Sequence, residues 1–253
     1  MTWRARATAA TIPLVAVAHG SRDPRAAATV EDLLDLVRRA RPELPVRAAY
    51  LDHAAPTLTG ALAELAEAAV VPLLLTEAYH SRVDIPGALA ALAARRPLLR
   101  VHLGTTLGPH PLLVTALERR LAEAGVRAGD PRTAVVLVSA GSSDRRANAT
   151  VSGIAADWAG RRGWWSVTAA YASAAEPTPA QAIRRLLSAG APRVVVAPYL
   201  LAPGHFADRI RRDALAAGAE AVAGVLGAAP ELAAVLLERY EQAVRRDRTS
   251  ATA

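Results

Sequence analysis

Three potential metal ligands lie in the first half of the chain, and each follows a segment that we predict to be a β-strand. His19 and Asp52 come directly after the first and second of these segments, and His80 lies in the loop after the third. In an open parallel sheet the carboxyl ends of the strands lie along one edge. Neighbouring strands are ~4.8 Å apart, so a strand order of 2-1-3-4 lets the three side chains converge. Two imidazoles and one carboxylate suit Co²⁺, Fe²⁺, Ni²⁺ or Zn²⁺, and we therefore predict a divalent-metal site at this edge.

The other histidines, and the acid itself, have simpler interpretations. A single histidine in a loop is usually a surface or hydrogen-bonding residue, and we assign that role to His53, His102 and His110. Asp52 is alternatively a cap for the helix that follows it. The two histidines of the candidate site differ from the rest, because both fall at predicted strand ends on the same edge.

The turn after the first strand combines small and polar residues. Ser21 and Asp23 are typical N-terminal caps, and Pro24 is favourable in the first turn of a helix. Gly20 and Ser21 can also present backbone N–H groups to a carboxylate. The sequence is compatible with both a capping role and an anion-binding role for this turn.

Short apolar segments alternate with helical patterns along the whole chain. In the first half we predict strands at 12–18, 46–51, 70–76 and 98–103, and helices at 25–41, 57–69, 85–95 and 111–124. In the second half we predict strands at 134–138, 165–171, 193–200 and 221–226, helices at 145–161, 178–189, 206–217 and 231–244, and a frayed tail from 245. Continuous apolar strands separated by helices indicate parallel sheets that are covered on both faces. The predicted fold class is therefore α/β, with two similar flavodoxin-like lobes, a four-stranded parallel sheet in each, and a cleft between them.

The second half of the chain repeats the first. HGS at 19–21 corresponds to AGS at 140–142, and Tyr50…Pro56 corresponds to Tyr171…Pro177 at the same spacing. Further matches follow in the same order, namely Pro72, His80, Ile85 and LGxxP from 107 against Pro198, His205, Ile210 and LGxxP from 226. Such a repeat indicates a duplication. We predict an N-terminal lobe at 1–126 that carries the metal site, a polar linker, and a degenerate C-terminal lobe at 134–253.

The composition limits the partners of the protein. All 30 basic residues are arginines and the formal net charge is +7, which favours an acidic partner. The arginines are scattered along helical patterns without basic runs or interleaved aromatics, so we expect no nucleic-acid partner. Cysteine is absent, which excludes disulfides and thiolate chemistry.

No segment of the chain predicts a membrane or nucleotide partner. No apolar run approaches the ~20 residues that span a bilayer. Residues 1–18 have some features of a signal peptide, but Pro13 interrupts the short apolar run, which equally suits a first strand. The glycine motifs of nucleotide-binding loops are missing. We therefore expect a cytoplasmic protein without a nucleotide cofactor, as a monomer or homodimer.

Four segments carry a resemblance to a known family. They are HGSRDP (19–24), the YLD…P segment (50–56), VVPLLLTEAYHSRVDIP (70–86) and LGPHPLL (107–113). Together they resemble the sirohydrochlorin chelatases, class II enzymes that load cobalt or iron for cobalamin or sirohaem synthesis. The resemblance covers nearly the whole chain, more closely in its first half. It implies that an acidic tetrapyrrole binds between two parallel lobes, and that catalytic histidines matching His19 and His80 hold the metal substrate with a carboxylate between them.

The chain departs from the family pattern at two places. Asp52 stands where the family usually has Glu, and its side chain is one methylene shorter. The second lobe has Ala140 and Ser173 at the positions of His19 and Asp52, and keeps only His205. We therefore expect one metal site. His205 either faces the macrocycle from the opposite wall or caps the helix that begins near 206.

The carboxylates of an acidic tetrapyrrole need cationic partners. Arg22, Arg82 and Arg209 fall near the predicted rim of the cleft and are the candidates. Gly20, Ser21 and His205 complete the predicted substrate-binding set.

Two other functions compete with metal insertion. A non-catalytic protein on the same fold can carry or sense a tetrapyrrole or a metal without turnover. An enzyme that is phosphorylated on its histidine needs an arginine directly before His-Gly, and here Ala18 takes that place, which disfavours that class.

Overall fold

Two four-stranded parallel sheets form the framework of the molecule. The computed structural model describes residues 11–77 and 83–250. In the first sheet β1 (Leu14–Ala18), β2 (Val46–Tyr50), β3 (Glu67–Pro72) and β4 (Arg100–Leu103) are ordered β2-β1-β3-β4. In the second sheet β5 (Thr133–Ser139), β6 (Ser166–Tyr171), β7 (Arg193–Pro198) and β8 (Ala221–Val222) are ordered β6-β5-β7-β8. The strand pairs are parallel in both sheets, so the predicted fold class is confirmed.

The central strands are buried because their sequences are apolar with little interruption. Every residue of β1 and of β5 is buried. Strands of this kind need helices on both faces of the sheet. The pairing register places Ala18 beside Tyr50 and Ser139 beside Tyr171. Neighbouring strands therefore end at the same level, and the loops that follow them share one edge.

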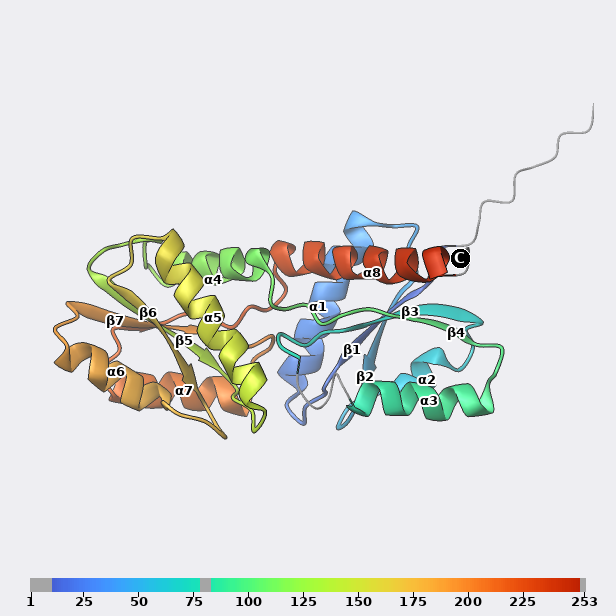
Figure 1. Cartoon of the computed structure of the whole chain (residues 1–253), viewed down its shortest axis with the longest axis horizontal. Helices are drawn as coiled ribbons and strands as arrows, with labels where there is room; N and C mark the ends of the chain where they lie inside the picture. Colours follow the sequence, from blue (N-terminus) through green and yellow to red (C-terminus); the bar gives the residue numbers. More distant parts are fainter. Residues whose placement is uncertain (1–10, 78–82, 251–253) are drawn as a thin grey trace, which may run out of the picture.

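Helices cover both faces of each sheet (Figure 1). In chain order they are α1 (Pro24–Ala40), α2 (Leu58–Leu62), α3 (Ile85–Arg95), α4 (Pro111–Glu123), α5 (Arg145–Arg161), α6 (Pro179–Ser188), α7 (His205–Ala216) and α8 (Pro230–Ser250). One face of the first sheet packs against α2 and α3, and the corresponding face of the second packs against α6 and α7. Within the described residues, no helix is long and apolar enough to cross a membrane.

The first helix begins as its sequence predicts. The Asp23 carboxylate accepts the Arg25 N–H at 3.0 Å, and Pro24 occupies the first turn. The Ser21 hydroxyl in turn accepts the Asp23 N–H at 3.0 Å. The capping role of Asp23 is therefore confirmed, whereas Ser21 bonds to the cap residue and does not itself cap α1.

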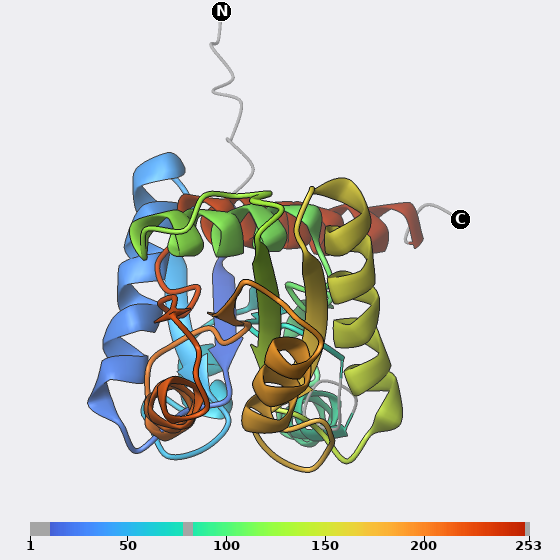
Figure 2. The ribbon, with the colours of Figure 1, turned by 90° about the vertical axis from the view of Figure 1, so that its left-hand side faces the viewer.

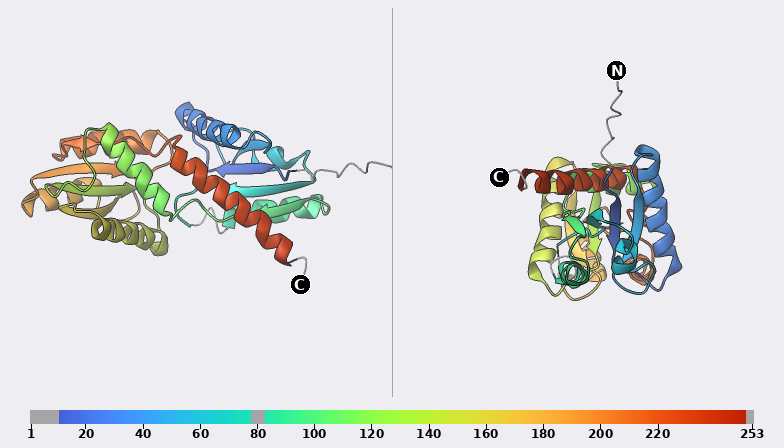
Figure 3. Two further views of the ribbon diagram at one scale, coloured as in Figure 1. Left: turned by 90° about the horizontal axis from the view of Figure 1, so that it is seen from above. Right: turned by 90° about the vertical axis from the view of Figure 1, so that its right-hand side faces the viewer.

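The last helix of each repeat packs on the sheet of the other repeat. After β4 the chain crosses the molecule so that α4 contacts β7, whereas α8 contacts α1, β3 and β4. Figures 2 and 3 show α4 and α8 together on one side of the molecule. Equivalent arginines fix both crossings, because Arg120 donates to the Leu226 carbonyl at 2.8 Å and Arg239 to the Thr106 carbonyl at 3.0 Å. The boundaries at 126 and 134 follow the sequence repeat, but each lobe in space includes a helix from the other repeat.

A single hydrophobic core joins the two lobes through these helices. It contains Leu14 of β1, Leu33 of α1, Leu117 of α4, Leu137 of β5 and Leu236 of α8, all of them completely buried. Burial of apolar surface is the main stabilising contribution to a fold. The relative position of the lobes therefore depends on the same core that stabilises each of them.

Several element boundaries differ from the sequence prediction. The helix predicted at 57–69 ends at Leu62. The chain from Glu67 instead pairs with β4, so that β3 spans Glu67–Pro72 where a strand was predicted at 70–76. An alanine-rich segment suits either element, and strand pairing decides between them. The strand predicted at 221–226 is limited to Ala221–Val222. The tail predicted from 245 is wrong, since α8 continues to Ser250.

Candidate active site

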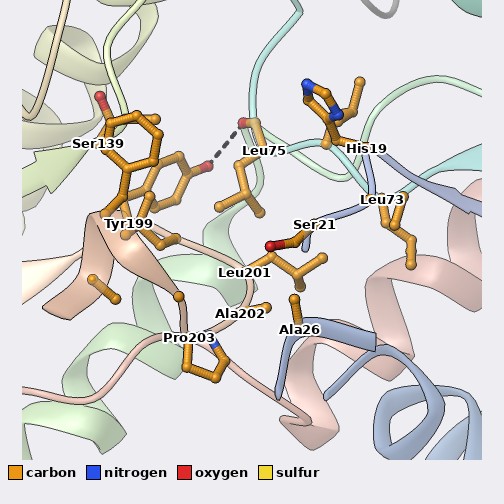
Figure 4. A pocket seen from close by; sticks show the side chains of 18 of the residues that line it. His19, Ser21, Ala26, Leu73, Leu75, Ser139, Tyr199, Leu201, Ala202 and Pro203 are labelled. Atoms are coloured by element: carbon orange, nitrogen blue, oxygen red, sulfur yellow. Dashed lines mark hydrogen bonds between the residues drawn. The ribbon is translucent and has the colours of Figure 1, made fainter. Parts of the chain in front are cut away.

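A cleft of about 910 Å³ lies between the two lobes at the carboxyl ends of their strands. The loops after β1 and β3 form one wall, and the loops after β5 and β7 form the other. The lining is mostly apolar, which together with its size is typical of small-molecule sites. Figure 4 shows residues of both walls, among them His19, Ser21, Leu73, Leu75, Ser139, Tyr199 and Leu201.

His19 lines this cleft directly after β1. The next residue, Gly20, has φ +97°, and a Cβ there would lie 1.7 Å from the Asp52 carbonyl oxygen. Only glycine permits both this conformation and this close approach. The Asp52 N–H also donates to the His19 carbonyl at 2.9 Å. The fold therefore brings the backbones of two predicted ligands into contact.

The Asp52 carboxylate is held by its neighbour. One oxygen accepts the His53 N–H at 2.7 Å, and the other lies 3.2 Å from His53 Nε2. The Asp52 side chain is 61% exposed. The alternative role as a helix cap is wrong, because Thr57 caps α2 through the Gly60 N–H. Asp52 as a metal ligand stays a prediction.

The third predicted ligand, His80, and the predicted carboxylate partner Arg82 lie outside the described residues. Within the described ranges, 11–77 and 83–250, no group of three or more His, Asp or Glu side chains has the arrangement of a metal site. The set formed by His19, Asp52 and His80 therefore stays a prediction.

Several predicted substrate-binding residues line the cleft. They are Gly20, Ser21, Arg22 and His205. Arg209 is absent from the lining, because its guanidinium donates to the Ala172 carbonyl and lies over the Phe206 ring. His205 is the first residue of α7, and the cap of that helix is Gly204 without a side-chain hydrogen bond. The capping alternative for His205 is therefore wrong.

In the second lobe, the main chain of the corresponding loop is hydrogen-bonded to a side chain of the helix that follows it. The Ser142 N–H donates to Asn148 Oδ1 at 3.0 Å, and the Asn148 amide donates back to the Ser142 carbonyl at 2.7 Å. In the first lobe Ala27 takes the place of Asn148. No side chain at that position competes for the Ser21 N–H.

Two of the remaining histidines have the ordinary roles predicted for them. His102 is buried and its Nε2 lies 2.7 Å from Glu67 Oε1. His110 caps α4 through the Leu112 N–H and lies 3.1 Å from Glu238. Each is therefore a hydrogen-bonding residue of the fold.

The sequence analysis did not place His53 or Phe206 at the cleft. His53 lines the cleft with a left-handed backbone, φ +59°. The sequence signal that could have indicated this is that His53 directly follows the predicted ligand Asp52. Phe206 also lines the cleft, with 41% of its surface exposed. A single phenylalanine in a helix pattern gives no sign that it faces a cavity.

Two contacts join the lobes beside the cleft. The buried Tyr199 hydroxyl donates to the Leu75 carbonyl at 3.1 Å (Figure 4), and burial raises the pKa of Tyr199, so the donor proton is kept. Arg25 of α1 bridges Asp23 and Asp208 of α7, at 2.6 Å from each. Hydrogen bonds from Arg25 hold the pKa of both carboxyls below the usual value.

Comparisons of the sequence with known proteins identify relatives over most of the chain. Residues 13–124 and 134–243 each match the family model CbiX. A sirohydrochlorin cobaltochelatase of Priestia megaterium is 26% identical over 239 residues, which cover 89% of this chain and 78% of that protein. A sirohydrochlorin ferrochelatase of Bacillus subtilis is 30% identical over 203 residues, which cover 78% of this chain and 77% of that protein.

Solved structures share the fold. SirB from Bacillus subtilis with Fe³⁺ has a TM-score of 0.82 at 24% identity, over 94% of this chain and 98% of that one. The sirohydrochlorin chelatase SirB from Bacillus subtilis subspecies spizizenii in complex with cobalt has a TM-score of 0.76 at 24% identity, over 94% and 97%. With both halves matched by one family model and both lobes present in the fold, the chain belongs to the CbiX family of sirohydrochlorin chelatases, in its duplicated two-lobe form.

Proposed function

We propose that the chain inserts Co²⁺ or Fe²⁺ into sirohydrochlorin or a related acidic tetrapyrrole. The observation that carries this proposal is that His19 of the first lobe and His205 of the second line the same cleft. The relatives named cobaltochelatase and ferrochelatase support the two metals. Ni²⁺ suits the same donor set and is a third metal to test. We further propose a cytoplasmic monomer or homodimer that uses no nucleotide.

Metal insertion requires two exchanges at one place. The macrocycle loses its pyrrole N–H protons while the metal leaves its water and protein ligands. A neutral imidazole nitrogen binds a metal ion and can accept a proton once that ion has left, so we assign His19 and His80 both to the metal and to proton transfer. Asp52 adds a negative charge that favours a dication. Such a site stays incomplete, which leaves positions for the incoming nitrogens.

The cleft suits a flat acidic molecule. Its mostly apolar lining is suited to cover the faces of a macrocycle. We assign the first-lobe loop to the carboxylates of the macrocycle, through the Gly20 and Ser21 N–H groups and the exposed Arg22 side chain. Arg82 is a further proposed partner, and His205 is proposed to face the macrocycle from the second lobe; Arg209, which is absent from the lining, is not assigned to a carboxylate.

Absorbance spectroscopy tests the proposal. Purified protein is mixed with an excess of sirohydrochlorin and, in parallel, with Co²⁺, Fe²⁺ or Ni²⁺. We expect the spectrum of the metallated product to accumulate over many turnovers, faster than in a protein-free control. The main alternative is a non-catalytic tetrapyrrole- or metal-binding protein, and it predicts a spectral change that stops at the concentration of protein.

A further inference from the structure

The phenylalanine of this chain has an unusual environment for its type. Phe206 is the only phenylalanine in the sequence, and 41% of its surface is exposed. Trp158 and Tyr199 are buried, and Trp165 is exposed but does not line the cleft. An exposed aromatic ring loses the stabilisation that burial would give. Its exposure on a cleft wall indicates that a ligand covers it.

The local backbone and two neighbours hold the ring at this wall. Gly204, with φ +152° and ψ −172°, caps α7 in a conformation that is almost restricted to glycine, and the helix begins at the next residue. The Arg209 guanidinium lies 5.1 Å from the ring centroid, a cation–π distance. Arg209 itself donates a hydrogen bond to the Ala172 carbonyl. The His205 and Phe206 rings are arranged edge to face, with their centroids 6.2 Å apart.

We propose that Phe206 is the residue on which the tetrapyrrole stacks, and that Arg209 is a positioning residue for its ring. The proposal rests on the proposed function. A conjugated macrocycle and a phenyl ring attract each other in offset-stacked geometry, beyond the gain from area burial. Because one residue keeps a cation over the ring, the ring is presented in a fixed orientation to the cleft. This assignment differs from a role of Arg209 as a direct carboxylate partner.

Binding of metal-free sirohydrochlorin tests the stacking role. Fluorescence titrations compare wild type with Phe206→Ala, Phe206→Leu and Leu215→Ala. Leu215 is a matched control, since it is on the same helix, is 44% exposed and does not line the cleft. We expect Phe206→Ala to weaken binding about tenfold, the scale of one lost aromatic contact, Phe206→Leu to weaken it less, and Leu215→Ala to have no effect. Equal binding by wild type and Phe206→Ala overturns the stacking role alone. Wild type that does not bind sirohydrochlorin overturns the proposed function, and the stacking role with it.

A double-mutant cycle tests the role of Arg209. If Arg209 acts by positioning the ring, Arg209→Gln weakens sirohydrochlorin binding in the wild type but adds nothing in the Phe206→Ala background. A loss of the same size in both backgrounds means that Arg209 contacts a carboxylate directly, and overturns its positioning role. Circular dichroism of each variant controls for folding.

Discussion

The two lobes have the same backbone around the cleft but different side chains. Gly20 and Gly141 both have positive φ, +97° and +83°, and both lie against the carbonyl of the loop after the next strand. The Asp52 N–H donates to the His19 carbonyl, and the Ser173 N–H donates to the Ala140 carbonyl, at 2.9 Å in both lobes. The second lobe adopts this arrangement with Ala140 and Ser173, where the first has His19 and Asp52. The geometry of the loop therefore does not depend on the side chains that are proposed to do chemistry.

This comparison separates the requirements of the fold from those of the site. Glycine is needed in both lobes, because a Cβ would meet backbone at 1.7 Å in the first and 1.9 Å in the second. The imidazole and the carboxylate occur only where metal is predicted to bind. The second lobe is thus an internal control for substitutions in the first.

The largest effect is expected from the histidines. His19→Ala copies the natural Ala140, so the variant should fold normally, and the rate of metal insertion should fall at least ~100-fold, as for the loss of a general base. His80→Ala should do the same. Initial rates with sirohydrochlorin and Co²⁺, together with thermal unfolding, measure both quantities. Wild-type rates in both variants would exclude the proposed site.

Substitution of the two glycines tests the equivalence of the backbones. Gly20→Ala and Gly141→Ala should each lower the free energy of unfolding by more than about 1 kcal/mol, because one strained residue costs about 1–3 kcal/mol. Gly153→Ala in α5 is the control, since nothing lies within 4 Å of the added methyl group. Urea unfolding compares the three. A large loss for one loop glycine and none for the other would show that the loops are not equivalent.

A smaller effect is expected from the acid. Asp52→Ser copies Ser173, and it should raise the Co²⁺ concentration needed for half-maximal rate several-fold more than it lowers the limiting rate. Asp52→Asn keeps an oxygen for the His53 N–H but removes the charge, so a similar result would assign the effect to electrostatics. If half-saturation by Co²⁺ stays at the wild-type value in both variants, Asp52 has no role at the metal.

The smallest effect is expected from the ion pair between the lobes. Arg25→Gln or Asp208→Asn should raise the dissociation rate of sirohydrochlorin a few-fold at most, because exposed ion pairs contribute little. The control is Arg146→Gln, since Arg146 is equivalent to Arg25 but bonds to Asp144 through its main-chain N–H, which the substitution keeps. Because Arg25 lowers the carboxyl pKa values, the pair persists at neutral pH and is lost only as the pH falls below the ordinary value of 3.8. A pH effect on dissociation near neutrality would have to come from other groups.

The sequence predicts the sheets well because uninterrupted apolar segments such as 14–18 have few alternatives. It does not predict the exchange of α4 and α8, since the crossing segments carry no signal for which sheet the next helix covers. The capping alternatives for Asp52 and His205 fail for a similar reason. Thr57 and Gly204 are also favourable N-caps by residue type, and the structure shows that they cap the helices in place of Asp52 and His205. The exposure of Phe206 in the cleft was not predicted, because the cleft is formed by both lobes together.

Calorimetric titration of Co²⁺ without tetrapyrrole tests the central claim, that one metal site belongs to the first lobe. We predict about one ion bound per chain in the wild type, loss of that binding in His19→Ala, and unchanged metal affinity in His205→Ala, since His205 is assigned to the macrocycle. Two ions per chain, or a His205→Ala variant that loses Co²⁺ while His19→Ala retains it, would contradict the account.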